Sequence, residues 1–268
     1  MSFFASVLRI LDASMKTPLP YGWFHLLWIG ITLLAAALLC RFRPNPRKTL
    51  LIVTIAVIIL EIYKQVNYTF DYENGITIDY QWYAFPFQFC STPMYIGLLA
   101  GLTRPGKFHD ALCAYLATFA VFAGAAVMVL PGDVFISTIG INIQTMVCHG
   151  SMVFLGIYLL QSGYVKLEHK TILKAVPVFA VCVSIAAVMN EVAYRAGLLK
   201  TEVFNMFFIS PYCAPHLPVY SAVQKAVPFP LCLVLYILGF SAAAYLVLLV
   251  AMGVGTIAAK LSKGKIAV

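Results

Sequence analysis

The chain has 268 residues, of which 62% are hydrophobic and only 10% are charged, and its mean hydropathy is +0.91. This composition excludes a water-soluble globular protein. The net charge of +8 does not indicate nucleic-acid binding, because the basic residues are dispersed among the connections between apolar segments, beside anionic lipid headgroups. We therefore predict a polytopic membrane protein.

Before the first long apolar segment, the first 20 residues contain Arg9 and Asp12 within an apolar stretch. They make a poor signal peptide, and we expect a short interfacial helix there. Seven segments further on can each cross about 30 Å of hydrocarbon as a helix, which satisfies its own backbone hydrogen bonds. We predict one domain, 1–268, that is an all-α membrane protein built as a bundle of seven transmembrane helices, with spans at 22–40, 49–68, 83–102, 110–130, 142–163, 171–194 and 226–254.

The basic residues predict the orientation of these helices. Alternate connections hold 12 of the 18 basic residues, namely Arg41, Arg43, Arg47, Lys48, Arg104, Lys107, Lys166, Lys170, Lys174, Lys260, Lys263 and Lys265. The positive-inside rule makes these connections cytoplasmic, so we expect the N-terminus outside and the C-terminus in the cytoplasm of a cell membrane, the plasma membrane of a bacterium. The outward connection 195–225 is either a lid over a pocket or a connector resting on the membrane surface, and we favour the connector.

Polar side chains gather in the outer halves of several spans. In the second span Glu61 and Lys64 are three residues apart and can neutralise one another. Ionisable groups at membrane depth cost about 2.5–3.5 kcal/mol each and usually line a cavity. We therefore predict an outward-opening polar pocket, although an interhelical clamp at Glu61 and Lys64, and a helix cap at Asn190 and Glu191, are equally good explanations of those pairs. The polar positions of the three spans are Thr54, Glu61, Lys64, Gln65 and Tyr68, then Asn142, Thr145 and His149, then Asn190, Glu191 and Tyr194.

Cys90 in the third span is the candidate nucleophile of this pocket. Pro86 and Pro93 flank it, and we predict that they kink the helix and let the thiol project into the pocket. At 1.5 Å per residue, Cys90 and His149 both lie about 10 Å below the outer boundary. A buried thiol needs a base to react, and His149 has the right depth. By its identity alone, a cysteine in such a helix is more often a packing residue, and Cys148 is our example.

The remaining cysteines give no sign of a disulfide framework or a metal site. Six of the seven cysteines lie within or at the ends of spans, and only Cys213 is in an outer loop. There is no Cys-x-x-Cys pair and no cluster of metal ligands. We predict no metal and no cofactor.

Several short segments resemble a known family, in the order in which they occur there. They are EIYKQ (61–65), FPFQFCSTPMY (85–95), PGDVF (131–135), TMVCHG (145–150), MNEVAY (189–194) and FNMFFISP (204–211). The chain resembles the YwaF-like bacterial integral membrane proteins from His25 to its last helix. That family is distantly similar to the transmembrane-protein-164 acyltransferases, and more remotely to the androgen-induced hydrolases of fatty-acid esters.

The resemblance implies a membrane-embedded nucleophile that works with a histidine on a later helix. The nucleophile position falls on Cys90 and the histidine position on His149, and Gln88 stands where many bacterial relatives have a second histidine. We therefore hypothesise a lipid acyltransferase, or acyl-ester hydrolase, that acts through a Cys90 thioester on a membrane phospholipid or lysophospholipid. Glu61 orients His149 in this hypothesis, and the oxyanion donor is one of Gln88, Asn142, Gln144 and Asn190.

An alternative from another class is a transporter or receptor. In that reading the polar layer binds a small polar or zwitterionic solute, and no reactive thiol is needed. The residues that this reading uses are Glu61, Lys64, His149, Asn190 and Glu191. The sequence does not determine the oligomeric state.

Overall fold

The computed structural model describes residues 12–71, 77–132, 134–198, 203–213 and 218–264. The interfacial helix that we expected in the first 20 residues therefore lies largely outside the described residues. The elements in chain order are α2 (Trp23–Phe42), α3 (Pro46–Asn67), β1 (Phe70–Asp71), β2 (Thr77–Ile78), η1 (Trp82–Ala84), α4 (Thr92–Leu102), α5 (Lys107–Tyr115), η2 (Leu116–Ala120), α6 (Val121–Val129), α7 (Ile139–Gln161), α8 (Lys170–Arg195), η4 (Met206–Phe208), α9 (Pro218–Ala226) and α10 (Phe229–Gly264).

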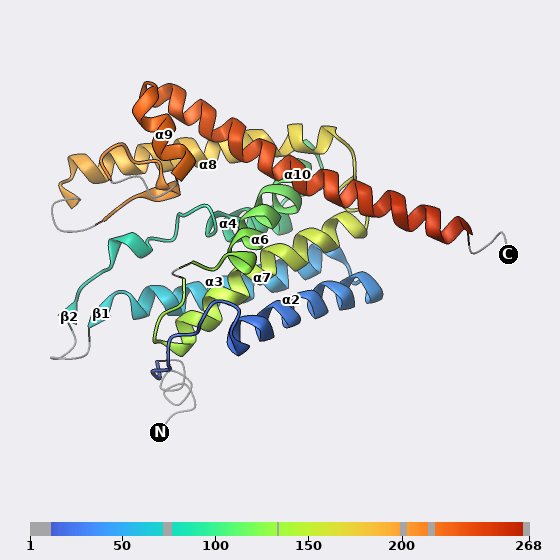
Figure 1. Cartoon of the computed structure of the whole chain (residues 1–268), viewed down its shortest axis with the longest axis horizontal. Coiled ribbons are helices and arrows are strands. Elements are labelled where there is room, and N and C mark those ends of the chain that lie inside the picture. The colour runs from blue at the N-terminus through green and yellow to red at the C-terminus, as the bar shows by residue number, and fades with distance from the viewer. Residues whose placement is uncertain (1–11, 72–76, 133, 199–202, 214–217, 265–268) are drawn as a thin grey trace.

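The described residues form a helical membrane bundle, as predicted (Figure 1). Its one sheet pairs β1 with β2 in antiparallel register, with Phe70 opposite Ile78, in a connection between helices. Six described helices are long and apolar enough to cross a membrane, and α5, η2 and α6 make up one of them as a continuous helix with a π-helical turn. The starts of these six helices lie within three residues of the predicted spans.

The single helix predicted at 83–102 is wrong. The structure has a short 3₁₀ turn at Trp82–Ala84, an irregular segment at 85–91, and then α4, whose 11 residues extend about 16 Å. Proline explains the break. Phe85 is extended, as the residue before Pro86 tends to be, and Pro93 occupies the first turn of α4, where its missing N–H costs nothing. The two prolines therefore interrupt the helix where we had expected a kink.

The continuous helix α5–α6 and the helix α7 form the centre of the bundle. In their apolar stretches 72% and 67% of the residues are buried, against 17–28% in the other four long helices. The outer helices expose large apolar side chains such as Leu34, Ile59 and Val250. A soluble protein rarely exposes so many, so these side chains face lipid.

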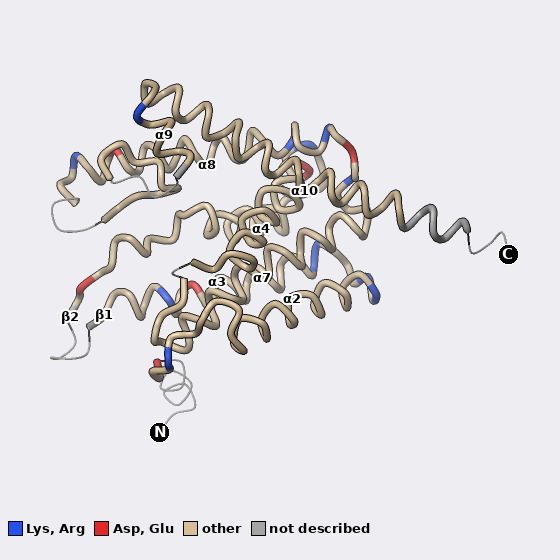
Figure 2. Tube along the Cα trace, viewed as in Figure 1, with Lys and Arg blue, Asp and Glu red and all other residues tan. Residues whose placement is uncertain are grey.

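Three of the basic connections meet at one end of the bundle. The Arg47 guanidinium donates to the carbonyls of Gly101 and Leu102, and the Tyr158 hydroxyl donates to the Pro44 carbonyl. Figure 2 shows that the charged residues gather toward the two ends of the helices. The predicted grouping of these loops is thus present, whereas the side of the membrane that they face stays a prediction.

Residues 203–213 belong to the 195–225 connection, which we predicted to rest on the membrane surface. This described part runs into the bundle instead, where Phe204, Met206, Phe207 and Ile209 are buried. The Phe207 ring stacks on Phe89, with 5.8 Å between ring centroids. We call residues 204–210 the inserted segment, because they pack against the broken third span.

Candidate functional site

Cys90 lies on the irregular segment, immediately before the N-cap residue Ser91 of α4. Irregular backbone at membrane depth is tolerated only where protein or a water-filled cavity surrounds it. Two side-chain hydroxyls donate to backbone carbonyls of this segment. The Phe89 carbonyl accepts from the Thr92 hydroxyl, and the Pro86 carbonyl accepts from the Tyr95 hydroxyl. The start of a helix favours a negative charge, whereas burial opposes one at this position.

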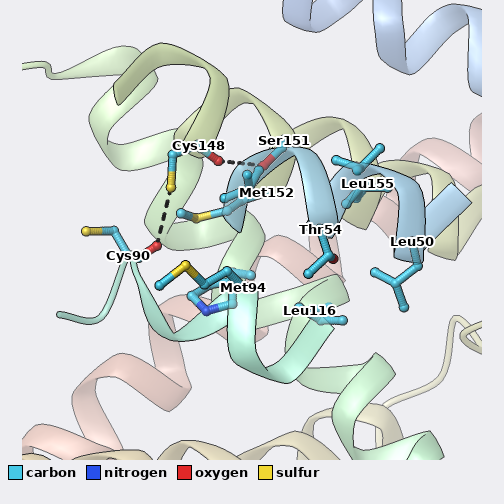
Figure 3. A pocket seen from close by; sticks show the side chains of 13 residues that line it. Leu50, Thr54, Cys90, Met94, Leu116, Cys148, Ser151, Met152 and Leu155 are labelled. Carbon is cyan, nitrogen blue, oxygen red and sulfur yellow. Dashed lines mark hydrogen bonds between the residues drawn. The ribbon is translucent and has the colours of Figure 1, made fainter. Parts of the chain in front are cut away.

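The side chain of α7 that contacts Cys90 is Cys148. Its thiol donates to the Cys90 carbonyl at 3.7 Å, and Figure 3 shows the Cys90 sulfur directed away from Cys148. A cavity of about 30 Å³ lies beside them between α3, α4 and α7, with Thr54, Met94 and Met152 in its wall. This cavity has room for about one water molecule and none for an acyl chain.

His149, the next residue of α7, is buried, and its Nδ1 lies 2.7 Å from the Thr145 carbonyl. A carbonyl only accepts, so Nδ1 carries the proton, and Nε2 of the neutral ring presents its lone pair. Lys64 is close enough to act electrostatically on both Cys90 and His149. The recorded contact of α7 with Cys90 is made by Cys148, and none is recorded between Cys90 and His149 among the described residues, so the predicted pairing of these two side chains stays a prediction.

Glu61 is the centre of a buried hydrogen-bond network between α3 and α7. Its Oε1 lies 2.8 Å from Lys64 Nζ and accepts from Gln65 Nε2 at 2.7 Å, and its Oε2 accepts from Gln144 Nε2 at 2.8 Å. The predicted pair of Glu61 and Lys64 is present. The bonds recorded for Glu61 among the described residues go to these three side chains, and none of them goes to His149.

Gln65 extends this network to the outer connections. Its Nε2 also donates to the Ala84 carbonyl at 2.9 Å, and its Oε1 accepts from the Tyr80 hydroxyl at 2.7 Å. Burial, and then the negative charge of Glu61, raise the pKa of Tyr80 to about 12. Tyr80 therefore stays protonated and keeps donating at neutral pH.

Gln88 and Asn190 hold the inserted segment. The amide group of Gln88 donates to the Asn205 carbonyl at 2.9 Å and accepts from the Phe207 N–H at 2.8 Å. Asn190 makes the same two kinds of bond with Met206, at 3.0 and 2.7 Å. These bonds fix a segment in which Phe207 and Phe208 have positive φ, so both amides serve structure.

Two other predicted site residues lie outside this neighbourhood. Asn142 is buried and bonds both backbone groups of Ile136, at 2.9 and 2.7 Å, so it braces the connection before α7. Glu191 is partly exposed and pairs with Arg195 at 2.6 Å, and it also accepts from the Tyr212 hydroxyl at 2.6 Å. The i,i+4 spacing of Glu191 and Arg195 was a signal for this surface pair.

The four amides proposed as oxyanion donors are therefore already engaged. Gln88, Asn142 and Asn190 bind backbone, and Gln144 binds Glu61. The side-chain nitrogen of Asn205 is the amide donor that is buried without a partner among the described residues. Sequence reasoning missed Asn205, because it lies in a connection that we did not expect to be buried.

A contact between a cysteine and a histidine lies on α5, near the basic end. Cys113 Sγ is 3.6 Å from His109 Nε2, and the Tyr164 hydroxyl lies 3.0 Å from the same nitrogen. Both side chains are buried. Because Tyr164 already occupies the ring nitrogen that a base would use, this pair is a structural contact.

The model of the TMEM164 family matches residues 20–255, which is most of the chain and includes every residue of the candidate site. No curated protein and no solved structure matches. The match bears out the predicted similarity to the transmembrane-protein-164 group and does not support the YwaF-like assignment.

Proposed function

This chain belongs to the TMEM164 family, and from that membership and the setting of Cys90 we propose that it is a lipid acyltransferase, or acyl-ester hydrolase, of the membrane. The observation that carries the proposal is the broken third span. It places a thiol on irregular backbone just before a helix within a membrane bundle, where such backbone must be buried in protein or line a cavity.

The proposed reaction has two steps. In the first, Nε2 of His149 takes the proton of the Cys90 thiol, and the thiolate attacks the carbonyl carbon of a lipid ester. The bond from carbonyl carbon to alkoxide oxygen breaks, the acyl group stays on the sulfur as a thioester, and His149 returns the proton to the leaving alcohol. In the second, the hydroxyl of a lysophospholipid or of water gives its proton to His149, and its oxygen attacks the thioester carbonyl carbon. A new C–O bond forms, the C–S bond breaks, and His149 returns the proton to the Cys90 thiolate.

One feature of the site supports the role of His149. The hydrogen bond from His149 Nδ1 to the Thr145 carbonyl fixes the tautomer in which Nε2 is the base. The Lys64 ammonium favours the Cys90 thiolate, whereas burial and the Glu61 carboxylate, with which Lys64 is paired, oppose it.

The alternative, a transporter or receptor for a polar or zwitterionic solute, has less support. To bind such a solute, charged side chains of the polar layer must be able to form further hydrogen bonds or ion pairs. Glu61 already accepts from three side chains, and Glu191 is paired with Arg195 at the surface. These pairings favour the enzyme.

Acyl labelling tests the proposal. The purified protein is incubated with a phospholipid that carries an alkyne-tagged acyl chain, and label that neutral hydroxylamine removes is measured. We expect such label on the wild type, its loss in Cys90→Ser, and slower formation in His149→Ala. Cys148→Ser is the matched control, because this thiol contacts Cys90 and has no assigned role in the reaction. Label that survives Cys90→Ser, or is lost equally in Cys148→Ser, contradicts the proposal.

A further inference from the structure

A cavity between α9 and α10 lies apart from Cys90. It measures about 370 Å³ and is lined almost wholly by apolar side chains, with Phe122 and Phe240 toward the bundle and Val219 and Val223 on α9. Its volume lies within the range of small-molecule sites. We call it the α9–α10 cleft; Figure 1 shows α9 beside the start of α10.

One polar atom in this cleft lacks a partner. Tyr220 lines the cleft and is only 6% exposed, and its hydroxyl has no hydrogen-bond partner among the described residues. Gln224, one turn further along α9, is near enough to affect the pKa of Tyr220 but does not complete a hydrogen bond. Buried tyrosine hydroxyls usually have an acceptor, so a ligand that supplies one fits this site.

The neighbouring tyrosine shows what satisfies such a group here. The rings of Tyr220 and Tyr236 lie 5.1 Å apart, and the Tyr236 hydroxyl donates to the Phe207 carbonyl at 2.9 Å. The Tyr236 hydroxyl thus has a carbonyl of the inserted segment as its acceptor, whereas the Tyr220 hydroxyl has no acceptor among the described residues. A carbonyl oxygen within an apolar molecule meets this requirement.

The frame of the cleft is fixed. The Cys232 thiol lies 3.8 and 3.4 Å from the carbonyls of Val223 and Val227, which ties the start of α10 to the end of α9. On the inner side the Phe240 ring makes an edge contact with Phe89 at 5.3 Å. The cleft is therefore bounded by fixed helices, and the Phe240 ring separates it from Phe89, the residue before Cys90.

We propose that the α9–α10 cleft binds one acyl chain of an ester-linked membrane lipid, and that the Tyr220 hydroxyl donates a hydrogen bond to the ester carbonyl of that lipid. The apolar side chains of the cleft contact the acyl chain, and the Tyr220 hydroxyl binds the ester carbonyl at the end of that chain. The site goes beyond the proposed function and does not depend on it, because binding requires no reaction at Cys90.

Gly239 offers a way to block the cleft. It lines the hollow, and a Cβ added there meets no heavy atom within 4 Å, so a larger side chain enters free space. Gly253 lies on the same helix, a Cβ there also meets nothing within 4 Å, and it does not line the cleft. Gly239→Phe and Gly253→Phe are therefore a matched pair.

Photolabelling tests the proposal on the full chain. The protein is reconstituted in vesicles of phosphatidylethanolamine and phosphatidylglycerol with a phosphatidylethanolamine probe whose acyl chain carries a diazirine, and labelled peptides are mapped. We expect label on residues 218–244, saturable by unlabelled ester lipid and lost in Gly239→Phe but not in Gly253→Phe. Label on α2, which comes from the surrounding bilayer, serves as the internal reference.

An ether-linked probe separates the role of Tyr220 from that of cleft shape. The ether lacks the carbonyl, so we expect the wild type to bind the ester probe about three- to tenfold more tightly, and Tyr220→Phe to bind both probes alike. Tyr220→Phe keeps the ring and is the informative variant if Gly239→Phe fails to fold. Equal ester and ether binding by the wild type overturns the proposal, and so does label that Gly239→Phe leaves unchanged. Cys90→Ser keeps the label whether or not Cys90 is catalytic.

Discussion

Glu61 illustrates how a single buried charge organises the neighbourhood of Cys90. A carboxylate at membrane depth persists only when donors surround it, and here Lys64, Gln65 and Gln144 supply them. Gln144 is the only one of the three that comes from another helix, so its bond to Glu61 links α3 to α7. The orientation of α7, which carries His149, depends in part on that bond.

Replacing Gln144 tests the strength of this link. Gln144→Leu keeps the volume but removes the donor to Glu61, and we expect the free energy of unfolding to fall by about 1–2 kcal/mol. The measurement is equilibrium unfolding in mixed micelles, followed by circular dichroism. Gln161→Leu is the control, because Gln161 is exposed at the end of the same helix, and we expect it to change little. If both variants lose the same free energy of unfolding, the hydrogen bond between Gln144 and Glu61 does not stabilise the protein.

At the scale of residues, the sequence predicted local pairs better than distant ones. The pair of Glu61 and Lys64 follows from their spacing on one helix. The contact of Gln144 with Glu61 joins residues 83 positions apart, and no periodicity within either helix reveals it. The shared depth of Cys90 and His149 predicted that they pair, whereas the recorded contact with Cys90 is made by Cys148, because rotation about α7 decides which of its side chains faces Cys90.

At the scale of elements, close approach of α6 and α7 positions the backbone of His149. A Cβ added at Gly124 would lie 2.5 Å from the His149 carbonyl oxygen and 2.8 Å from Met152 Cβ. A Cβ at Gly156 would lie 2.0 Å from Val121 Cγ2. Small residues let membrane helices pack at this distance, and these two glycines serve that purpose.

Gly124→Ala is therefore expected to destabilise the protein and to slow acyl transfer. Overpacking costs about 1–3 kcal/mol, whereas the gain in helix propensity from glycine to alanine is at most about 1 kcal/mol. Gly30→Ala on α2 is the control, because an added Cβ there meets nothing within 4 Å and only the gain in helix propensity remains. Thermal unfolding and the rate of acyl labelling are the two measurements. If the Gly124→Ala protein is as stable as the Gly30→Ala protein, α6 shifts away from the added Cβ without a loss of folding free energy, which contradicts this prediction.

The elements that the sequence predicted wrongly share a physical cause. Apolar content alone identifies a segment that leaves water, but it does not distinguish a helix from buried irregular backbone. The run 83–102 is largely apolar, yet Pro86 and Pro93 stop the helix from forming as one piece. The inserted segment is also apolar and was assigned to a connection by its position in the chain. Its side-chain partners, Gln88 and Asn190, belong to other elements and gave no local signal.

At the scale of the whole molecule, the orientation in the membrane decides which leaflet supplies the substrate. The end of the bundle where Arg47 binds Gly101 and Leu102 also holds the connection with Arg104 and Lys107. The positive-inside rule directs such an end to the cytoplasm. The irregular segment with Cys90 comes before α4, whose last residues reach that basic end, so we predict that Cys90 lies in the outer half of the bilayer.

Cysteine accessibility tests this orientation. Gly106 lies in the basic connection, and an added Cβ there meets nothing within 4 Å, while Ser137 is exposed in the connection between α6 and α7 at the other end. In a Cys213→Ser background, we expect a membrane-impermeant maleimide to label Ser137→Cys on intact cells and Gly106→Cys only after the cells are permeabilised. Cys213 is removed because it is partly exposed in an outer connection. The reverse pattern would place Cys90 in the cytoplasmic leaflet, and the acyl donor and acceptor would then have to be lipids of that leaflet.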